Sequence, residues 1–422
     1  MPGTEADARA LDAADPLSTY RDRFLFPASP NGPDGPPAIY LAGQSLGLQS
    51  RTVRPMVEAQ LDRWARLGVE GHFAADPPGP WFTDDETFRA PMARVVGARP
   101  SEVAVLNTLT VDLHLLLASF YRPSGTRRRV LTDAPLFPSD RHALDSHLRF
   151  RGLDPAADLI VVGPRPGEDL VRLEDLEDAI GDAGDTLALV LFDGINFATG
   201  QRLPVRRLTE AAHAVGAVAG WQMAHAAGNL PLALHDDDVD FAVWCTYKYL
   251  NGGPGSIGAI FVHERHTGGG GAAVAPALTG WWGAIPDHRF DPSGPFVPDT
   301  GAAAWKMSTG PLFNSIALAA SLAIFDEVGM AALRERSVRL TASLEEVLDE
   351  AGVEVISPRD PEARGAQLSA RFPDAQATLA AIEARCVIAD YRAPDIIRFA
   401  PIPLYSSFHD LWRLGEVFRA IR

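Results

Sequence analysis

The middle of the chain alternates short apolar runs with stretches of helical hydrophobic period, and this alternation limits the possible folds more than any other feature. Residues 102–108, 187–193, 217–223 and 239–246 are runs of strand length, and helical patterns such as residues 205–215 lie between them. Strands that are apolar on both faces and separated by helices favour a largely parallel sheet covered on both sides. The sequence therefore predicts an α/β protein.

The last hundred residues follow a different pattern. Long helical stretches over 313–328 and 330–351 precede short strands, and a helix over 406–421 has Ser407 as its expected N-cap residue. A chain of 422 residues is long enough for two or three domains. We expect three segments: an N-terminal segment that completes the small domain (1–50), a large domain (51–315) and a smaller α+β C-terminal domain (316–422).

Charge and composition exclude several classes of protein. The 38 basic and 54 acidic residues give a formal net charge of −16, which disfavours binding to nucleic acid or to anionic membranes. Two cysteines argue against a disulfide framework. The apolar runs 115–120 and 187–192 are too short to span a bilayer, and the acidic N-terminus lacks the apolar core of a signal peptide. We expect a soluble cytoplasmic enzyme that needs no membrane.

The densest chemical signal lies where one apolar strand ends. Lys248 follows Tyr247 there, and a loop rich in glycine and proline over 252–255 comes next. Open α/β sheets bind ligands at the carboxyl ends of their strands. Burial lowers the pKa of a lysine, and the neutral amine can then form an imine. Pyridoxal phosphate (PLP) requires such a lysine, although a surface lysine in a loop fits the same spacing.

Two segments that follow strands contain residues suited to a phosphorylated ring. Leu109 and Thr110 lie between a strand and a helix, where Thr110 can cap the helix while free backbone N–H groups face a phosphate. In the segment LFPSD, Phe137 can stack on a planar ring and Asp140 can pair with a ring nitrogen. The structural alternatives are a threonine cap without a ligand and a core aromatic beside a turn aspartate.

Two more segments place polar side chains in apolar surroundings. Gln222 and His225 can reach one pocket if their strand gives way to a turn, the alternative being a buried histidine with a structural role. Arg398 can grip a carboxylate with two hydrogen bonds or form a salt bridge at a strand edge. The glycine run 268–271 lacks the pattern of a phosphate loop. Neither Cys245 nor the histidines have metal-ligand spacing, so we expect no metal.

Together these segments resemble the kynureninase family, whose members are PLP-dependent enzymes of the aminotransferase-like fold type I. The resemblance implies a mostly parallel seven-stranded sheet in the large domain, pyridoxal 5'-phosphate as cofactor, an amino-acid substrate and a homodimer. It runs from about Tyr40 to the C-terminus on these motifs, in order: YLAGQSLGLQ, GHFAADPPGPWFTDDE, NTLTVDLHLL, FPSD, TGQ, AHAAGN, WCTYKYLNGGPG, GWWG and PIPLYSSFHD.

The resemblance also implies a role for each matching residue. Lys248 would form the imine with the cofactor and then move protons. Trp281 would close the phosphate side, from its own or a neighbouring subunit. The other implied positions are Leu109, Thr110 and Tyr247 at the phosphate, Phe137 stacked on the ring with Asp140 beneath it, His225 at the cofactor's border, and Arg398 and His72 on the substrate side.

Three positions depart from the family pattern. Gln222 stands where the family has an aspartate that pairs with the protonated pyridine nitrogen, and a neutral amide cannot stabilise that charge in the same way. Asp193 stands where a small residue is usual, and either Asp193 or Asp140 can supply the missing carboxylate. Thr309 stands where the family has an asparagine that contacts cofactor and substrate.

We therefore expect a kynureninase-type hydrolase that cleaves the Cβ–Cγ bond of kynurenine, or of a substituted kynurenine, to an anthranilate and alanine. The departures leave open a diverged PLP enzyme of specialised metabolism, either a C–S β-lyase on cysteine conjugates or a decarboxylating or oxygen-consuming deaminase. A third possibility is a non-catalytic descendant that only binds ligands. The presence of Lys248, Thr110 and Arg398 disfavours it.

Overall fold

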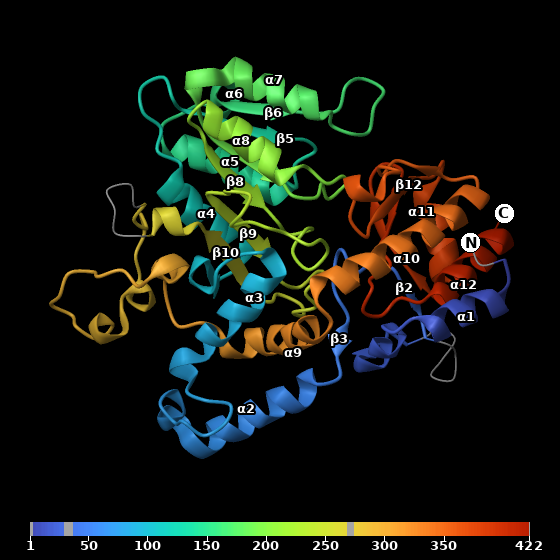
Figure 1. Cartoon of the computed structure of the whole chain (residues 1–422), viewed down its shortest axis with the longest axis horizontal. Coiled ribbons are helices and arrows are strands. Elements are labelled where there is room, and N and C mark those ends of the chain that lie inside the picture. The colour runs from blue at the N-terminus through green and yellow to red at the C-terminus, as the bar shows by residue number, and fades with distance from the viewer. Residues whose placement is uncertain (1–2, 29–36, 268–273, 422) are drawn as a thin grey trace.

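The computed structural model of the chain describes residues 3–28, 37–267 and 274–421. They form two bodies that lie beside each other, each built around one main sheet (Figure 1). The glycine run 268–271 lies outside the described residues. The order of the strands in the larger sheet decides where a ligand can bind.

The larger body is organised by a seven-stranded sheet. β10 (Gly258–Val262) runs antiparallel to both of its neighbours, and the other strands pair in parallel. The mostly parallel seven-stranded sheet expected from the sequence is therefore confirmed. In sheet order the strands are β4 (Val103–Leu106), β10, β9 (Phe241–Cys245), β8 (Val218–Gln222), β7 (Leu187–Asp193), β5 (Arg129–Asp133) and β6 (Leu159–Val162).

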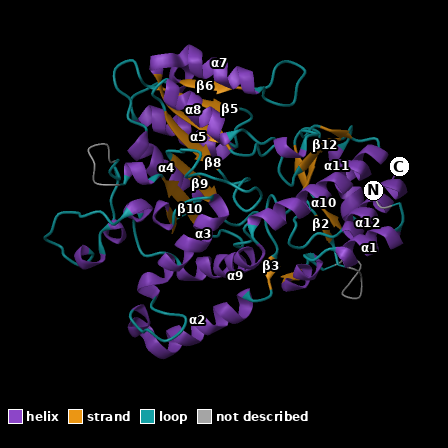
Figure 2. Cartoon of the chain, viewed as in Figure 1, coloured by secondary structure: helices purple, strands orange, loops and turns teal. Residues whose placement is uncertain are grey.

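Helices cover both faces of this sheet (Figure 2). Alternate residues of β9 show why both layers are needed: Phe241 and Val243 belong to one apolar cluster, and Ala242 and Trp244 belong to another. The first cluster includes residues of the helices α4 (Leu109–Phe120) and α5 (Pro138–Phe150). The second cluster includes residues of α3 (Arg89–Val96), α7 (Leu173–Ala183), α8 (Val205–Ala214) and α9 (Leu312–Val328). A short helix, α6 (Pro155–Asp158), precedes β6.

The smaller body contains a four-stranded antiparallel sheet. The N-terminal segment joins this body, because β2 (Ile39–Tyr40) pairs with β13 (Val387–Ile388) and α1 (Glu5–Ala14) packs on α12 (Phe408–Ile421). In sheet order the strands are β11 (Glu354–Val355), β12 (Leu368–Arg371), β15 (Ile396–Phe399) and β14 (Asp390–Arg392). Residues of the helices α10 (Met330–Glu350) and α11 (Ala375–Glu383) belong to the same apolar cluster as residues of this sheet.

Ser407 caps α12, as the sequence predicts. Its Oγ accepts a hydrogen bond from the amide of Asp410 at 3.0 Å, and Asp410 Oδ2 accepts one from the amide of Ser407 at 3.2 Å. This reciprocal pair satisfies two backbone donors at the helix start, and the carboxylate of Asp12 in α1 accepts from the next two amides.

α9 links the two bodies. It packs on α2 (Val53–Leu67), on α3 and on β3 (Gln49–Ser50), which pairs with β1 (Phe24–Leu25), and α10 follows it directly. The expected domain limit between residues 315 and 316 lies inside α9, so the three expected segments stay a prediction. No single helix of the described residues is long and apolar enough to cross a membrane, and α9 with α10 meets those criteria only as a pair bent by 87°.

A buried ion pair fastens the N-terminal segment to α10. Arg336 Nε donates to Asp15 Oδ2 at 2.6 Å, and the two side chains are 1% and 0% exposed. Burial opposes ionisation of Asp15, but the hydrogen bond and charge of Arg336 outweigh it and lower the pKa of the carboxyl group. The pair therefore stabilises the fold only while both groups are charged.

We predict that Asp15→Ala lowers the free energy of unfolding by about 3 kcal/mol at neutral pH, because the Arg336 guanidinium is left buried without its carboxylate. The contribution is present above the ordinary aspartate pKa of about 3.9 and is lost as pH falls through the lower pKa of the folded state. Denaturant unfolding of wild type and variant at several pH values measures the difference. The exposed Asp22 supplies the control, and an equal loss in Asp22→Ala would contradict the assignment.

Candidate active site

Lys248 follows the carboxyl end of β9 and lies against the turn that follows β8. Its Nζ is 2.9 Å from Nε2 of His225 and 5.8 Å from the ring centroids of Phe137 and Tyr247. Burial lowers the pKa of Lys248, and burial together with the charge of Lys248 lowers the pKa of His225 well below its ordinary value. The amine thus faces a neutral imidazole between two aromatic rings.

Carboxyl groups gather opposite this amine at the ends of adjacent strands. Asp133 ends β5, Asp193 ends β7, and Asp140 lies in the first turn of α5. Burial raises the pKa of all three, and for Asp193 the charges of the other two add to the effect. Gln222, at the end of β8, donates from Nε2 to Asp140 Oδ2 at 3.0 Å. The structure thus places the two family departures Gln222 and Asp193 together.

Two helix N-termini meet beside this group. Thr110 in the first turn of α4 and Ser139 in the first turn of α5 have their hydroxyl oxygens 2.7 Å apart. The expected capping role of Thr110 is wrong, because the chain leaves the extended conformation at Thr108 and the helix already starts at Leu109. The unpaired backbone N–H groups and the positive dipole ends of two helices suit a phosphate group.

Arg398 on β15 is 1% exposed and already has partners. Its Nη2 lies 2.8 Å from Asp390 Oδ1 and 3.1 Å from Ser45 Oγ, and its Nη1 donates to the carbonyl oxygen of Phe197 at 2.6 Å. The structure therefore contains the salt bridge that the sequence left open. The charge of Arg398 also lowers the pKa of Lys248 and His225, so it acts on the same site.

Three expected residues lie apart from Lys248 within the chain. His72 and Thr309 line a cavity of about 210 Å³ with aromatic walls, to which none of the residues around Lys248 contributes, and Thr309 also lines a second cavity with Thr108 at the start of α4. Trp281 is 40% exposed and packs edge-on against Trp282. The cavity also holds Asp84, which the sequence did not single out although it lies in the WFTDDE motif. Burial and the neighbouring Asp85 raise the pKa of Asp84 to about 6.

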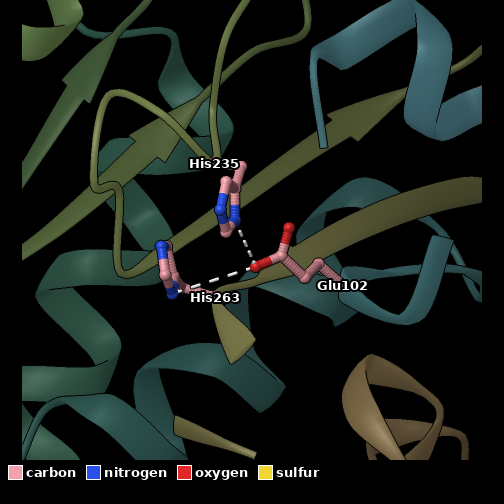
Figure 3. A group of neighbouring side chains, drawn as sticks. All are labelled: Glu102, His235 and His263. Atoms are coloured by element: carbon pink, nitrogen blue, oxygen red, sulfur yellow. Dashed lines mark hydrogen bonds and ion pairs between the residues drawn. The ribbon is translucent and has the colours of Figure 1, made fainter. Parts of the chain in front are cut away.

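Glu102, His235 and His263 form a second polar cluster that sequence spacing did not indicate (Figure 3). His235 Nδ1 lies 2.8 Å from Glu102 Oε1, and one ligand atom from each residue lies within 4.8 Å of the others, close enough to hold a metal ion. Backbone amides already use the same atoms: Glu264 donates to Glu102 Oε1 at 2.9 Å and Arg265 to His263 Nδ1 at 3.2 Å. The bond from Glu264 fastens the end of β10 to the 3-10 turn Pro100–Glu102 before β4.

The fold defines a class of protein. A mostly parallel seven-stranded sheet with a partly buried lysine after an apolar strand is the arrangement of PLP-dependent enzymes of fold type I. The chain has this fold in common with a cysteine desulfurase from Thermococcus onnurineus (TM-score 0.74, 18% identity, 91% of this chain and 94% of that one). It is also similar to the cystine C–S lyase C-DES (TM-score 0.76, 16% identity, 90% and 97%).

Sequence comparison identifies the family within that class. The family model of the kynureninase C-terminal domain matches residues 333–418. A kynureninase of Salinispora tropica is 49% identical over 99% of this chain and 97% of that relative. A kynureninase of Myxococcus xanthus is 48% identical over 97% and 95%. The chain belongs to the kynureninase family.

The reactivity of Lys248 can be measured directly, because the whole sequence has only two lysines, Lys248 and Lys306. Lys306 is 1% exposed and paired with Asp85. We predict that PLP followed by borohydride labels Lys248 and leaves Lys306 unmodified. Labelling should reach half its maximum below the ordinary lysine pKa of about 10.4, because a lowered pKa keeps the amine neutral at lower pH.

Peptide mass spectrometry across a pH series measures this labelling. Lys248→Arg should abolish it, and Lys306→Arg, the matched control, should leave it unchanged. Labelling of Lys306 in preference to Lys248, or a midpoint at the ordinary lysine pKa, would contradict the environment described for Lys248.

Proposed function

We propose that this chain hydrolyses the Cβ–Cγ bond of L-kynurenine, or of a ring-substituted kynurenine, to an anthranilate and alanine. The observation that carries the proposal is full-length similarity to kynureninases at 49% and 48% identity. The contact between Lys248 and His225 and the buried Arg398 support it, because an amine that can form an imine and a guanidinium that can bind a carboxylate lie at one site. The expected cytoplasmic location is part of the same proposal.

The residues around Lys248 fit pyridoxal 5'-phosphate. His225 Nδ1 and Asp140 Oδ1 are buried and have no hydrogen-bond partner among the described residues, so both can take up a polar ligand atom. Phe137 is 38% exposed at the mouth of the site and can stack on a ring. Leu109 and Thr110 offer the first-turn amides of α4 to a phosphate. When bound, the cofactor supplies an electron sink for negative charge that forms on the substrate.

Lys248 is the residue suited to carry protons. Its amine lies in a buried site, where desolvation favours the neutral form, so it can accept a proton from the substrate Cα and return it at a neighbouring position. His225 keeps the amine oriented without competing for that proton, because its own pKa is lowered further by burial and by Lys248. The positions of both side chains follow from the strand ends of β8 and β9.

Arg398 is the residue suited to bind the substrate α-carboxylate. Its guanidinium has donors in a planar fork that matches a carboxylate. Asp390 occupies part of that fork at 2.8 Å, and Ser45 and the Phe197 carbonyl hold the rest. A substrate carboxylate competes with these partners, so binding requires the contacts around Arg398 to rearrange.

A homodimer is the second part of the proposal. Phe73, Trp281 and Phe290 are 61%, 40% and 66% exposed, and each packs against another aromatic ring, so together they leave apolar surface in water. A second copy of the chain would cover this surface. It would also allow the cavity with His72 and Thr309 to meet the Lys248 site of the other copy.

The direct test is to add L-kynurenine and 3-hydroxy-L-kynurenine to PLP-loaded protein and to assay anthranilates and alanine. We expect equimolar release of both products, and none from Lys248→Ala. Turnover of cysteine conjugates with no release of anthranilate would move the assignment to a C–S lyase.

A second prediction concerns Arg398. Arg398→Lys should raise the KM for kynurenine by about tenfold or more with a smaller change in kcat, because a hydrogen bond to a charged group is lost in the bound state. Arg392 is the matched control, since it pairs with the same Asp390 at 3.0 Å but is 38% exposed. Equal kinetic effects of Arg398→Lys and Arg392→Lys would contradict a direct role for Arg398.

A further inference from the structure

Three buried carboxyl groups share the site with one lysine, and none of the three accepts a hydrogen bond from a cationic side chain within the described ranges. Asp133 accepts from the amide of Asp193 at 3.0 Å and from Asn196 Nδ2 at 3.4 Å. Asp140 accepts only from Gln222. This cluster has fewer cations than carboxyl groups, so a cationic ligand atom would stabilise it.

Gln222 is a poor partner for such a cation, because it is neutral and already hydrogen-bonded at both amide atoms. Its Nε2 donates to Asp140 Oδ2 at 3.0 Å, and its Oε1 accepts from the amide of Ala224 at 2.6 Å. Both amide atoms are therefore engaged, and the side chain is held in one orientation. The effect of Gln222 falls on Asp140, which it keeps in place.

Asp193 is placed one strand away from Gln222. The two residues are in register on the parallel strands β7 and β8, so their side chains leave the sheet on the same face, about 4.8 Å apart in the strand-pairing direction. Asp193 is 9% exposed, and its carboxyl group has no hydrogen-bond partner among the residues that the structure describes. Its backbone is held by Asp133. Its carboxyl group therefore lies on the sheet face that Gln222 also occupies, and the charge of Lys248 acts on it.

We propose that Asp193 is the carboxylate that pairs with the protonated ring nitrogen of the cofactor, and that Gln222 is a positioning residue that orients Asp140. This inference rests on the PLP site of the proposed function. On binding, the Asp193 carboxyl proton moves to the ring nitrogen, so a neutral acid and a neutral pyridine become a carboxylate and a pyridinium cation. No further reactant is needed. Burial raises the pKa of Asp193, which keeps that proton available before the cofactor binds.

Asp140 is the competing candidate. One of its oxygens already accepts from Gln222, so only Oδ1, which is buried without a partner among the described residues, is open to a ligand. Asp140 also follows Phe137 by one helical turn, and its amide donates to the Phe137 carbonyl oxygen at 3.0 Å. It is therefore tied to the residue suited to stack on the ring face, whereas Asp193 lies at a strand end beside Gln222.

The experiment measures directly whether the ring nitrogen of the bound cofactor is protonated. PLP labelled with 15N at that position is loaded into wild type, Asp193→Ser, Asp140→Asn and the double variant Asp193→Ser/Gln222→Asp. The 15N resonance reports whether the nitrogen carries a proton, and no substrate is present. We expect a protonated nitrogen in wild type, its loss in Asp193→Ser, and its recovery in the double variant, which returns the carboxylate to the neighbouring strand.

An unprotonated nitrogen in wild type, or a protonated one in Asp193→Ser, overturns the proposal, and loss only in Asp140→Asn assigns the role to Asp140. Failure of the double variant to restore the proton overturns the argument from strand register. The result does not depend on kynurenine turnover, so a failed activity assay and a failed assignment of Asp193 remain distinguishable.

Thermal unfolding separates a binding role from a structural one. Without PLP, Asp193→Ser and Asp193→Asn should melt no lower than wild type, because a buried carboxyl group is removed. The dissociation constant for PLP should rise by about tenfold or more, as expected for loss of one hydrogen bond between charged groups, and the shift in Tm on adding PLP should shrink. An equal fall in Tm with and without PLP would show that Asp193 is structural and would overturn the proposal.

Discussion

The burial of one amine at the end of an apolar strand is the constraint on which the rest of the site depends. β9 is buried along its whole length, so Lys248 leaves it partly buried, and desolvation lowers the pKa of its amine. A charged ammonium group is energetically unfavourable there, and the neighbouring groups change that free energy. His225 is neutral, and carboxyl groups lie at the ends of the neighbouring strands. The parallel sheet makes this convergence possible, because its strands end along the same edge.

Much of the fold could be predicted from the chain because its determinants are local. The run Leu187–Asp193 is buried at every position and forms β7 with the predicted limits, and Ser407 caps its helix through residues three positions apart. The antiparallel direction of β10 could not be predicted, since hydrophobic period gives the same pattern for both directions. The start of α4 differs from the expected one for a related reason: the backbone conformation at Thr108, not the presence of a threonine at 110, decides where the helix begins.

Proximity between site residues could be predicted only where their motifs lie at the ends of adjacent strands. Gln222, His225 and Lys248 follow adjacent strands, so their proximity follows from strand order. The partner of Arg398 did not follow, because Asp390 reaches it across a β14–β15 register that composition does not encode. The separation of His72 and Thr309 from Lys248 could not be predicted either. A motif shows which residues occur together in a family, but not which subunit or cavity brings them together.

The near absence of lysine has a consequence for the outer surface. Only two of the 38 basic residues are lysines, one in the candidate active site and one in a buried ion pair, so every other basic side chain is an arginine. Guanidinium groups stay protonated throughout the alkaline range, whereas surface ammonium groups lose their charge near pH 10. The electrostatic field around this molecule is therefore almost constant from neutral pH to about pH 10, where tyrosines begin to ionise. Changes of rate with alkaline pH in this interval then report on buried groups and not on a discharging surface.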